Sequence, residues 1–138
     1  MTQKDKELLL KDLSARLMYG VKIETPKGIG NLGTIKLTIF YHELGVNIKA
    51  TERDYFPLDE CKPYLRPMSS MTEEEKVEYY NTMDKETQRN YPNSCDFSES
   101  VYYSNTIKTF DWLNAHHFDY RGLIKKGLAI DCTNLNIY

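Results

Sequence analysis

The chain has 138 residues, of which 41% are hydrophobic and 28% are charged, and its formal net charge at pH 7 is −2. This length predicts one domain over residues 1–138, and the composition excludes a disordered tail or a fibrous repeat. A chain so close to neutrality is not expected to bind duplex nucleic acid, because contacts with phosphates usually require a basic domain.

The first predicted element is an amphipathic helix over residues 3–18. Its leucines recur at three- and four-residue steps, the spacing that places side chains on one helix face: Leu9, Leu10, Leu13 and Leu17. Gly20 follows and is expected to end the helix. The apolar face must then pack against the rest of the domain.

Three strands are predicted next. Apolar and polar residues alternate, as in a half-buried strand, over residues 21–24, 34–41 and 46–51. The segments 25–33 and 42–45 are expected to be turns. The longest strand would place four large side chains on one face: Ile35, Leu37, Ile39 and Tyr41. Short strands joined by short loops favour an antiparallel meander with one face in water.

The middle of the chain predicts an irregular segment followed by a helix. Pro57, Pro63 and Pro67 interrupt residues 56–67, which we expect to wrap over the surface without a long regular element. Serine and threonine then precede a run of glutamates, the pattern of a capped helix with acidic residues in its first turn. We expect this helix over residues 72–83.

The rest of the chain predicts shorter elements. The polar segment 84–104 would include a helical turn near 84–90, and a helix is expected over 106–118, a short helix over 120–126 and an edge strand over 128–130. The inward face of the 106–118 helix would carry Ile107, Phe110, Leu113 or Asn114, and His117. The whole pattern predicts an α+β fold, with a small antiparallel sheet of three or four strands and helices packed on one face.

The stretch from Gly28 to Gly33 matches the letters of the dinucleotide-binding pattern G-x-G-x-x-G. That pattern holds a pyrophosphate when a strand precedes it and a helix follows it. Here the strand predicted over 34–41 follows it, and glycines are common in tight hairpin turns. We therefore favour a hairpin turn over a phosphate-binding loop.

The neighbouring His116 and His117 lie close in sequence to Asp111 and Asp119. Adjacent side chains on a helix point about 100° apart, whereas a helical zinc pair needs histidines four residues apart. We expect one partly buried and one solvated histidine, with no metal and no cofactor. A small metal-dependent hydrolase that uses His42, His117 and Asp119 is kept as an alternative.

Three cysteines, at positions 61, 95 and 132, form no Cys-x-x-Cys pair, so we expect reduced, buried thiols rather than a disulfide framework or a zinc ribbon. No serine or cysteine carries the local pattern of a catalytic nucleophile, and no catalytic residue is assigned. The sequence begins without a signal-peptide pattern and has no apolar run of about 20 residues. We expect a cytoplasmic protein without a membrane partner.

Aromatic residues next to cations form the strongest candidate site. The chain has 11 Tyr and 5 Phe against 1 Trp, and the residues assigned to ligand or partner binding are Tyr64, Arg66, Trp112, His117, Tyr120 and Arg121. Aromatic rings and guanidinium groups stack on bases, bind phosphates and are enriched in protein interfaces. The structural alternative is that the tyrosines cover a small core.

These features favour a non-enzymatic binding protein that captures either a small anionic, nucleotide-like ligand or a host protein. Besides the hydrolase, a homo-oligomeric structural or regulatory subunit is the other alternative.

Several stretches resemble small proteins of gut Bacteroides-type bacteria and their phages. The similarity covers about half of the chain, in residues 64–76, 111–124 and 126–129 and in the opening residues 8–13, 16–17 and 19–21. The resemblance implies a source in phages or other mobile elements, with the host cytoplasm as the location of a phage-encoded protein. It implies no activity and no functional residue.

Overall fold

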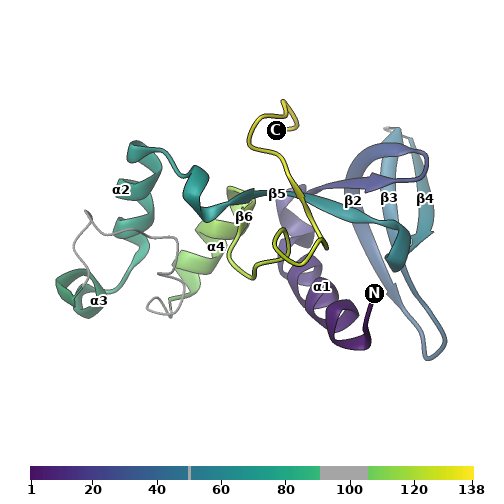
Figure 1. The fold of residues 1–138 in the computed structure, drawn as a ribbon, viewed down its shortest axis with the longest axis horizontal. Coiled ribbons are helices and arrows are strands. Elements are labelled where there is room, and N and C mark those ends of the chain that lie inside the picture. The colour runs from purple at the N-terminus through teal and green to yellow at the C-terminus, as the bar shows by residue number, and fades with distance from the viewer. Residues whose placement is uncertain (50, 91–105) are drawn as a thin grey trace.

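A computed structural model describes residues 1–49, 51–90 and 106–138 (Figure 1). Its helices are α1 (Gln3–Arg16), α2 (Glu73–Thr82), α3 (Lys85–Asn90) and α4 (Ile107–Ala115). Its strands are β1 (Lys22–Thr25), β2 (Gly28–Leu37), β3 (His42–Lys49), β4 (Glu52–Pro57), β5 (Lys62–Pro67), β6 (Phe118–Asp119) and β7 (Ile130–Asp131). The predicted α+β class is confirmed. The predicted polar segment beyond residue 90, together with Cys95, lies outside the described residues.

The sheet has seven strands, so the expectation of three or four was wrong. The strand order is β4-β3-β2-β1-β5-β6, and β7 also pairs with β5. Strands β1 to β5 pair antiparallel, whereas β6 and β7 run parallel to β5. The prediction missed β4 and β5 because of their prolines. Pro57 and Pro67 end these strands and Pro63 is the second residue of β5, positions near strand ends where a missing N–H is tolerated.

The turn between β2 and β3 lies earlier than predicted. Strand β2 ends at Leu37, and His42, expected in a turn, begins β3. The Thr38 hydroxyl holds the turn, since it accepts hydrogen bonds from the Phe40 and Tyr41 N–H groups and donates to the Tyr41 carbonyl. The predicted strand 34–41 therefore folds back at Thr38, and Ile39 and Tyr41 do not lie on a sheet face.

The glycine-rich stretch is part of strand β2 instead of forming a loop. The hairpin turn itself joins Thr25 to Gly28, whose φ of 124° favours glycine. Gly30 lies where β3 approaches closely, and a Cβ atom there would stand 2.7 Å from the carbonyl oxygen of Asn47. The close approach of β3 explains why residue 30 is a glycine. No turn over the whole stretch and no phosphate is needed to explain it.

Helices α1 and α2 begin directly after their N-capping residues. In α1, Thr2 and Asp5 form a capping box, and in α2 Thr72 and Glu75 form another, in agreement with the predicted helices over 3–18 and 72–83. Helix α4 ends at Ala115, before the predicted residue 118. A 3₁₀ turn extends α1 from Leu17 to Tyr19, and Gly20 ends it with a φ of 65°.

Three details of the last third of the chain differ from the prediction. Ile107, expected to point inward, is exposed, whereas Leu113 and Asn114 are buried. Residues 120–126 form turns rather than a helix. The strand predicted over 128–130 overlaps β7 only at Ile130, and β7 runs parallel to β5.

Two apolar clusters hold the molecule together. The first joins α1 to the sheet and is formed by Leu9, Leu13, Val21, Ile23, Leu32, Leu44, Val46, Phe56, Leu58, Cys61, Leu65, Leu123, Leu128 and Ala129. The second joins α2 to α4 and is formed by Met68, Met71, Tyr79, Met83, Leu113 and Phe118. Strand β5 runs between the two ends of the molecule (Figure 1). Packing of all helices on one sheet face, as predicted, is therefore wrong for α2 and α4.

In the part of the chain that the structure describes, no helix combines the length and the apolar character needed to cross a membrane. Cys61 and Cys132 are free and buried, as expected from their spacing. Burial raises the pKa of the Cys61 thiol to about 12 and raises that of Cys132 as well, which disfavours the thiolate form of both residues.

Candidate functional site

The six predicted site residues all make contacts within the molecule. They lie on β5, on α4 and on the segment that contains β6: Tyr64, Arg66, Trp112, His117, Tyr120 and Arg121. Each is engaged by a hydrogen bond, an ion pair or a stacked ring. These contacts give each residue a structural role, and their assignment to a binding site stays a prediction.

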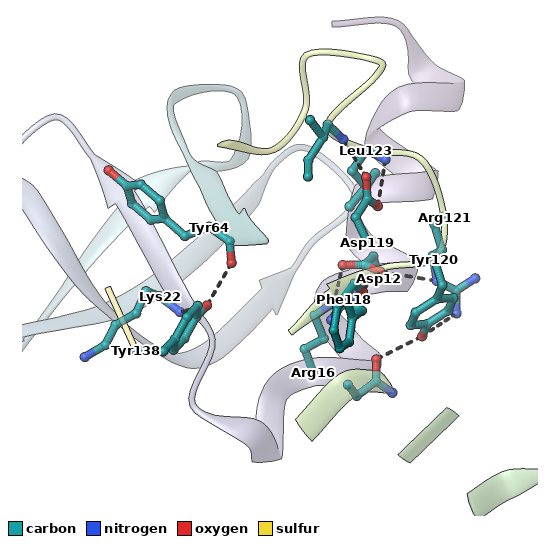
Figure 2. A network of polar contacts seen from close by, with 12 residues as sticks. Asp12, Arg16, Lys22, Tyr64, Phe118, Asp119, Tyr120, Arg121, Leu123 and Tyr138 are labelled. Carbon is teal, nitrogen blue, oxygen red and sulfur yellow. Dashed lines mark hydrogen bonds and ion pairs between the residues drawn. The ribbon is translucent and has the colours of Figure 1, made fainter. Parts of the chain in front are cut away.

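Arg121 belongs to a buried ionic network around Asp12 (Figure 2). The Arg16 guanidinium donates to both carboxylate oxygens of Asp12, at 2.6 and 3.0 Å, and to the carbonyl oxygen of Phe118 at 2.7 Å. Arg121 Nε lies 3.3 Å from the same carboxylate. Asp12 and Arg16 are fully buried, so the network ties α1 to β6, where the two apolar clusters meet.

Asp119 and Tyr120 complete this region. The Asp119 carboxylate accepts hydrogen bonds from the backbone N–H groups of Leu123 and Ile124, so it caps a turn. The Tyr120 hydroxyl donates to the side chain of Asn114 at 2.9 Å. Asp119, which the hydrolase alternative treats as a catalytic or ligating group, thus has a structural role on each of its two oxygens.

Arg66 is bound to the start of α2. Its guanidinium donates to both carboxylate oxygens of Glu75, at 2.7 and 2.8 Å, and to the Ser70 carbonyl. It also stacks 4.3 Å above the ring of Phe118. The hydrogen bonds from Arg66 lower the pKa of Glu75 below its usual value. The positive charge of Arg66 is therefore already compensated.

Trp112 lies in the second apolar cluster. Its ring stacks on His116, with centroids 4.1 Å apart, and on Phe118. Its indole N–H donates to Glu78 at 3.3 Å. The tryptophan therefore packs against its own fold, with His116 as its stacked neighbour.

Tyr64 is buried at the centre of β5, where its hydroxyl donates to Glu24 of β1 at 2.6 Å. Burial and the Glu24 carboxylate raise the pKa of Tyr64 to about 12. This tyrosine joins two neighbouring strands.

His117 is the predicted residue with the most unusual surroundings. Its φ of 60° lies in the left-handed region, which histidine enters infrequently. The ring is about nine-tenths buried, and its Nδ1 atom has no hydrogen-bond partner among the described residues. It stacks on the ring of Tyr138, with centroids 3.7 Å apart and an angle of 10° between the planes. Strained backbone and an unpaired buried polar atom are typical of functional positions.

Sequence reasoning missed Tyr138, because no pattern surrounds it. Figure 2 shows its side chain entering between β1 and β5. The hydroxyl accepts a hydrogen bond from the Lys22 N–H at 3.0 Å and donates one to the Tyr64 carbonyl at 2.8 Å. Nearly half of the residue surface is exposed, yet burial of the hydroxyl raises the pKa of Tyr138 above its usual value.

Sequence reasoning also missed the turn between β2 and β3 as a surface. Four of its large apolar residues are exposed: Leu37 by 62%, Ile39 by 91%, Phe40 by 86% and Tyr41 by 53%. We call residues 37–41 the apolar tip. Leu37 still pairs with His42, whereas the other three follow the end of β2. Four apolar residues among five were the available signal in the sequence, but the alternation typical of a strand concealed it.

Within the described ranges, no group of three or more His, Cys, Asp or Glu residues is arranged to hold a metal ion. Comparison with models of known families, with curated proteins and with solved structures finds no match. The resemblance to proteins of Bacteroides-type bacteria and their phages therefore stays a prediction.

Proposed function

We propose that this chain is a non-enzymatic binding protein that inserts its apolar tip into an apolar pocket of a partner protein. The observation that carries the proposal is the exposure of Leu37, Ile39, Phe40 and Tyr41 at one turn. Contiguous apolar surface of this kind marks interaction sites in folded proteins. For a phage-encoded protein the partner would be a host protein of the cytoplasm, where free thiols such as those of Cys61 and Cys132 persist.

The tip is held in one conformation before any partner binds. Thr38 makes three hydrogen bonds across the turn with its hydroxyl, and its backbone N–H donates to the Tyr41 carbonyl. The turn continues from two paired strands and extends beyond the end of β4 (Figure 1). A rigid, projecting turn loses little conformational entropy on binding, which favours affinity.

The charges near the tip favour a protein over an anionic membrane. Lys36 lies opposite Glu43 in the β2–β3 register, and its ammonium group stacks on the ring of Tyr55 at 3.9 Å. Peptide segments that enter anionic bilayers usually carry several uncompensated basic residues beside their apolar side chains. The single lysine here is balanced by a glutamate.

A small anionic ligand is the weaker alternative. Arg16 and Arg121 share the single carboxylate of Asp12, and Glu75 pairs with Arg66. A ligand phosphate at Arg66 would have to displace Glu75, and one at the fully buried Arg16 would have to disrupt a buried ion pair, which costs several kcal/mol.

Site-specific photo-crosslinking tests the proposal. The photoreactive residue p-benzoyl-phenylalanine replaces Phe40 in one variant and exposed Ile107 of α4 in another. We expect position 40, and not position 107, to crosslink one protein in a lysate of the host bacterium. That protein, once purified, should bind the unmodified chain.

Three other results would contradict the proposal. They are identical crosslinks from both positions, crosslinks from position 40 to a second copy of this chain, and sedimentation of the protein with vesicles of phosphatidylcholine and phosphatidylglycerol that requires Ile39 and Phe40.

A further inference from the structure

The pairing between β1 and β5 is opened by a side chain. Ile23 pairs with Pro63, and Glu24 pairs with Lys62. The same antiparallel register makes Lys22 and Tyr64 the next pair. Instead of bonding to one another, the Lys22 N–H donates to the Tyr138 hydroxyl and the Tyr64 carbonyl accepts from it. A phenol thus occupies a slot between the two strands (Figure 2).

The slot selects a particular chemistry. One wall is the flat ring of His117, 3.7 Å from the Tyr138 ring and nearly parallel to it. The floor offers one backbone donor, on Lys22, and one backbone acceptor, on Tyr64. A planar ring with a hydroxyl group satisfies both, because a phenol donates and accepts. A phenylalanine side chain would leave both backbone groups unpaired.

The segment that carries Tyr138 is loosely attached. Residues 133–136 are exposed. Among the described residues, the hydrogen bonds of segment 133–138 other than those of the Tyr138 hydroxyl reach no farther than Asp131. We call residues 133–138 the strap. Its hold on the body of the protein depends on the Tyr138 side chain.

A groove adjoins the slot and leaves room for a longer ligand. It has a volume of about 390 Å³, and its lining includes three strap residues, Thr133, Leu135 and Tyr138, together with residues outside the strap that stay in place when the strap lifts. Ser70 and Thr72, before α2, line the groove with hydroxyl-bearing side chains. Such groups can pair with the backbone of a peptide on either side of an inserted ring.

We propose that the slot between β1 and β5 is a binding site for the tyrosine side chain of a peptide, and that Tyr138 occupies it as an internal competitor. A peptide gains access when the strap lifts away. Because the occupied state dominates, the apparent affinity of the unaltered protein is reduced by the fraction of molecules whose slot is open. This site is separate from the apolar tip, and its test does not involve a tip residue.

The test is a titration of the full chain and of its Tyr138→Ala variant with two peptides, Ac-Ala-Tyr-Ala-NH₂ and Ac-Ala-Phe-Ala-NH₂. The NMR signals of the His117 ring report stacking. We expect the tyrosine peptide to bind the variant at least about tenfold more tightly than the unaltered protein, since the competitor is gone. The phenylalanine peptide should bind the variant at least about tenfold more weakly than the tyrosine peptide, because it cannot pair with the backbone groups.

A matched control is Tyr41→Ala, which removes an exposed tyrosine of the apolar tip and should bind as weakly as the unaltered protein. A second variant, Tyr138→Phe, keeps the stacked ring and loses both hydrogen bonds, so it should show an intermediate gain. If circular dichroism shows that Tyr138→Ala does not fold, the peptide titration of Tyr138→Phe decides the test.

The proposal is overturned if the His117 signals fail to respond to the tyrosine peptide in the folded variants, or if both peptides bind equally. Equal affinity for free p-cresol and for the tyrosine peptide would also overturn it, since a peptide should gain from the groove.

Discussion

Asp12 shows how a single carboxylate can bring distant parts of this chain together. It binds Arg16 within α1 and Arg121 near β6, and Arg16 in turn donates to the Phe118 carbonyl, 102 residues away in sequence. Asp12 and Arg16 are both removed from water, so their contribution to the stability of the fold depends on each charge keeping its partner.

We predict that Asp12→Ala destabilises the fold by about 3 to 5 kcal/mol, the usual cost of removing one partner of a buried ion pair. The loss leaves the Arg16 charge buried without a carboxylate. Urea denaturation measures the free energy of unfolding. Asp59→Ala is the control, because the pair between Asp59 and Lys6 is largely exposed and should contribute less than about 1 kcal/mol. Similar losses for both variants would show that the network is not structural.

The surroundings of His117 predict a dependence of stability on pH. Burial lowers its pKa from 6.5 to about 4, and the nearby charges of Arg16, His116, Arg66 and Lys22 act in the same direction. Between these pH values the unfolded chain binds more protons than the folded one. This contribution is therefore complete above about pH 6.5 and is lost as the pH falls toward 4, by at most about 3 kcal/mol.

The comparison uses urea midpoints of the unaltered protein and of His117→Asn between pH 4.5 and 7.5. Asparagine tolerates the left-handed backbone of this position and does not titrate. We expect the stability of the unaltered protein to fall more steeply toward pH 4.5 than that of the variant. Parallel curves would mean that His117 is freely hydrated.

The sequence identified these residues more readily than their roles. Aromatic and basic residues lie in the segments around β5 and β6, but the partners that engage them could not be read from local patterns. Glu75 is nine residues from Arg66, and Asp12 is more than a hundred residues from Arg121. Local spacing carries no information about such pairs, so the arginines looked free to bind a ligand.

At the scale of elements, helices were predicted better than strands. The capping boxes at Thr2 and Thr72 are local signals, and the structure confirms the helices that follow them. Strand β5 depends on pairing with β1, about 40 residues away in sequence, and β4 pairs with the preceding strand β3 in spite of Pro57 at its end. The turn at Thr38 contains no glycine, proline or asparagine. Without these typical turn residues, the alternating pattern over 34–41 predicted a continuous strand.

The β2–β3 pairing predicts a difference between two glycines. A Cβ atom on Gly30 would meet the Asn47 carbonyl and Val46 at 2.7 Å, whereas one on Gly33 would meet the side-chain ends of Asn47 and Arg53 at 2.9 to 3.1 Å. Gly30→Ala must move backbone and should cost about 1 to 3 kcal/mol.

Gly33→Ala can be accommodated by flexible side chains, and we expect a smaller loss. Urea denaturation of the two variants makes the comparison. A larger loss for Gly33→Ala would contradict the close strand approach at Gly30.

At the scale of the whole molecule, the apolar residues of the two buried clusters differ from those of the exposed apolar tip. The two buried clusters account for the leucines of α1 and the aromatics of α4, and β5 and the segment from Phe118 to Leu123 connect them. That both clusters form one domain stays a prediction. The apolar tip belongs to neither cluster, so it has no structural role that would explain its residues.

Because the tip is exposed, its loss should leave the fold intact. The double substitution of Ile39 and Phe40 by serine should change the free energy of unfolding by less than about 0.5 kcal/mol. The matched control replaces Met18 and Ile107 by serine, two residues that are exposed by 88% and 80% in other parts of the chain.

The most direct measurement is the affinity of the purified crosslinked partner for the unaltered protein and for these two double variants, by isothermal titration calorimetry. We predict that the variant with Ile39→Ser and Phe40→Ser binds the partner at least about thirtyfold more weakly than the unaltered protein does, as expected for residues at the centre of an interface. The variant with Met18→Ser and Ile107→Ser should bind like the unaltered protein. Equal affinity of both variants for the partner would contradict the proposal that the apolar tip binds it.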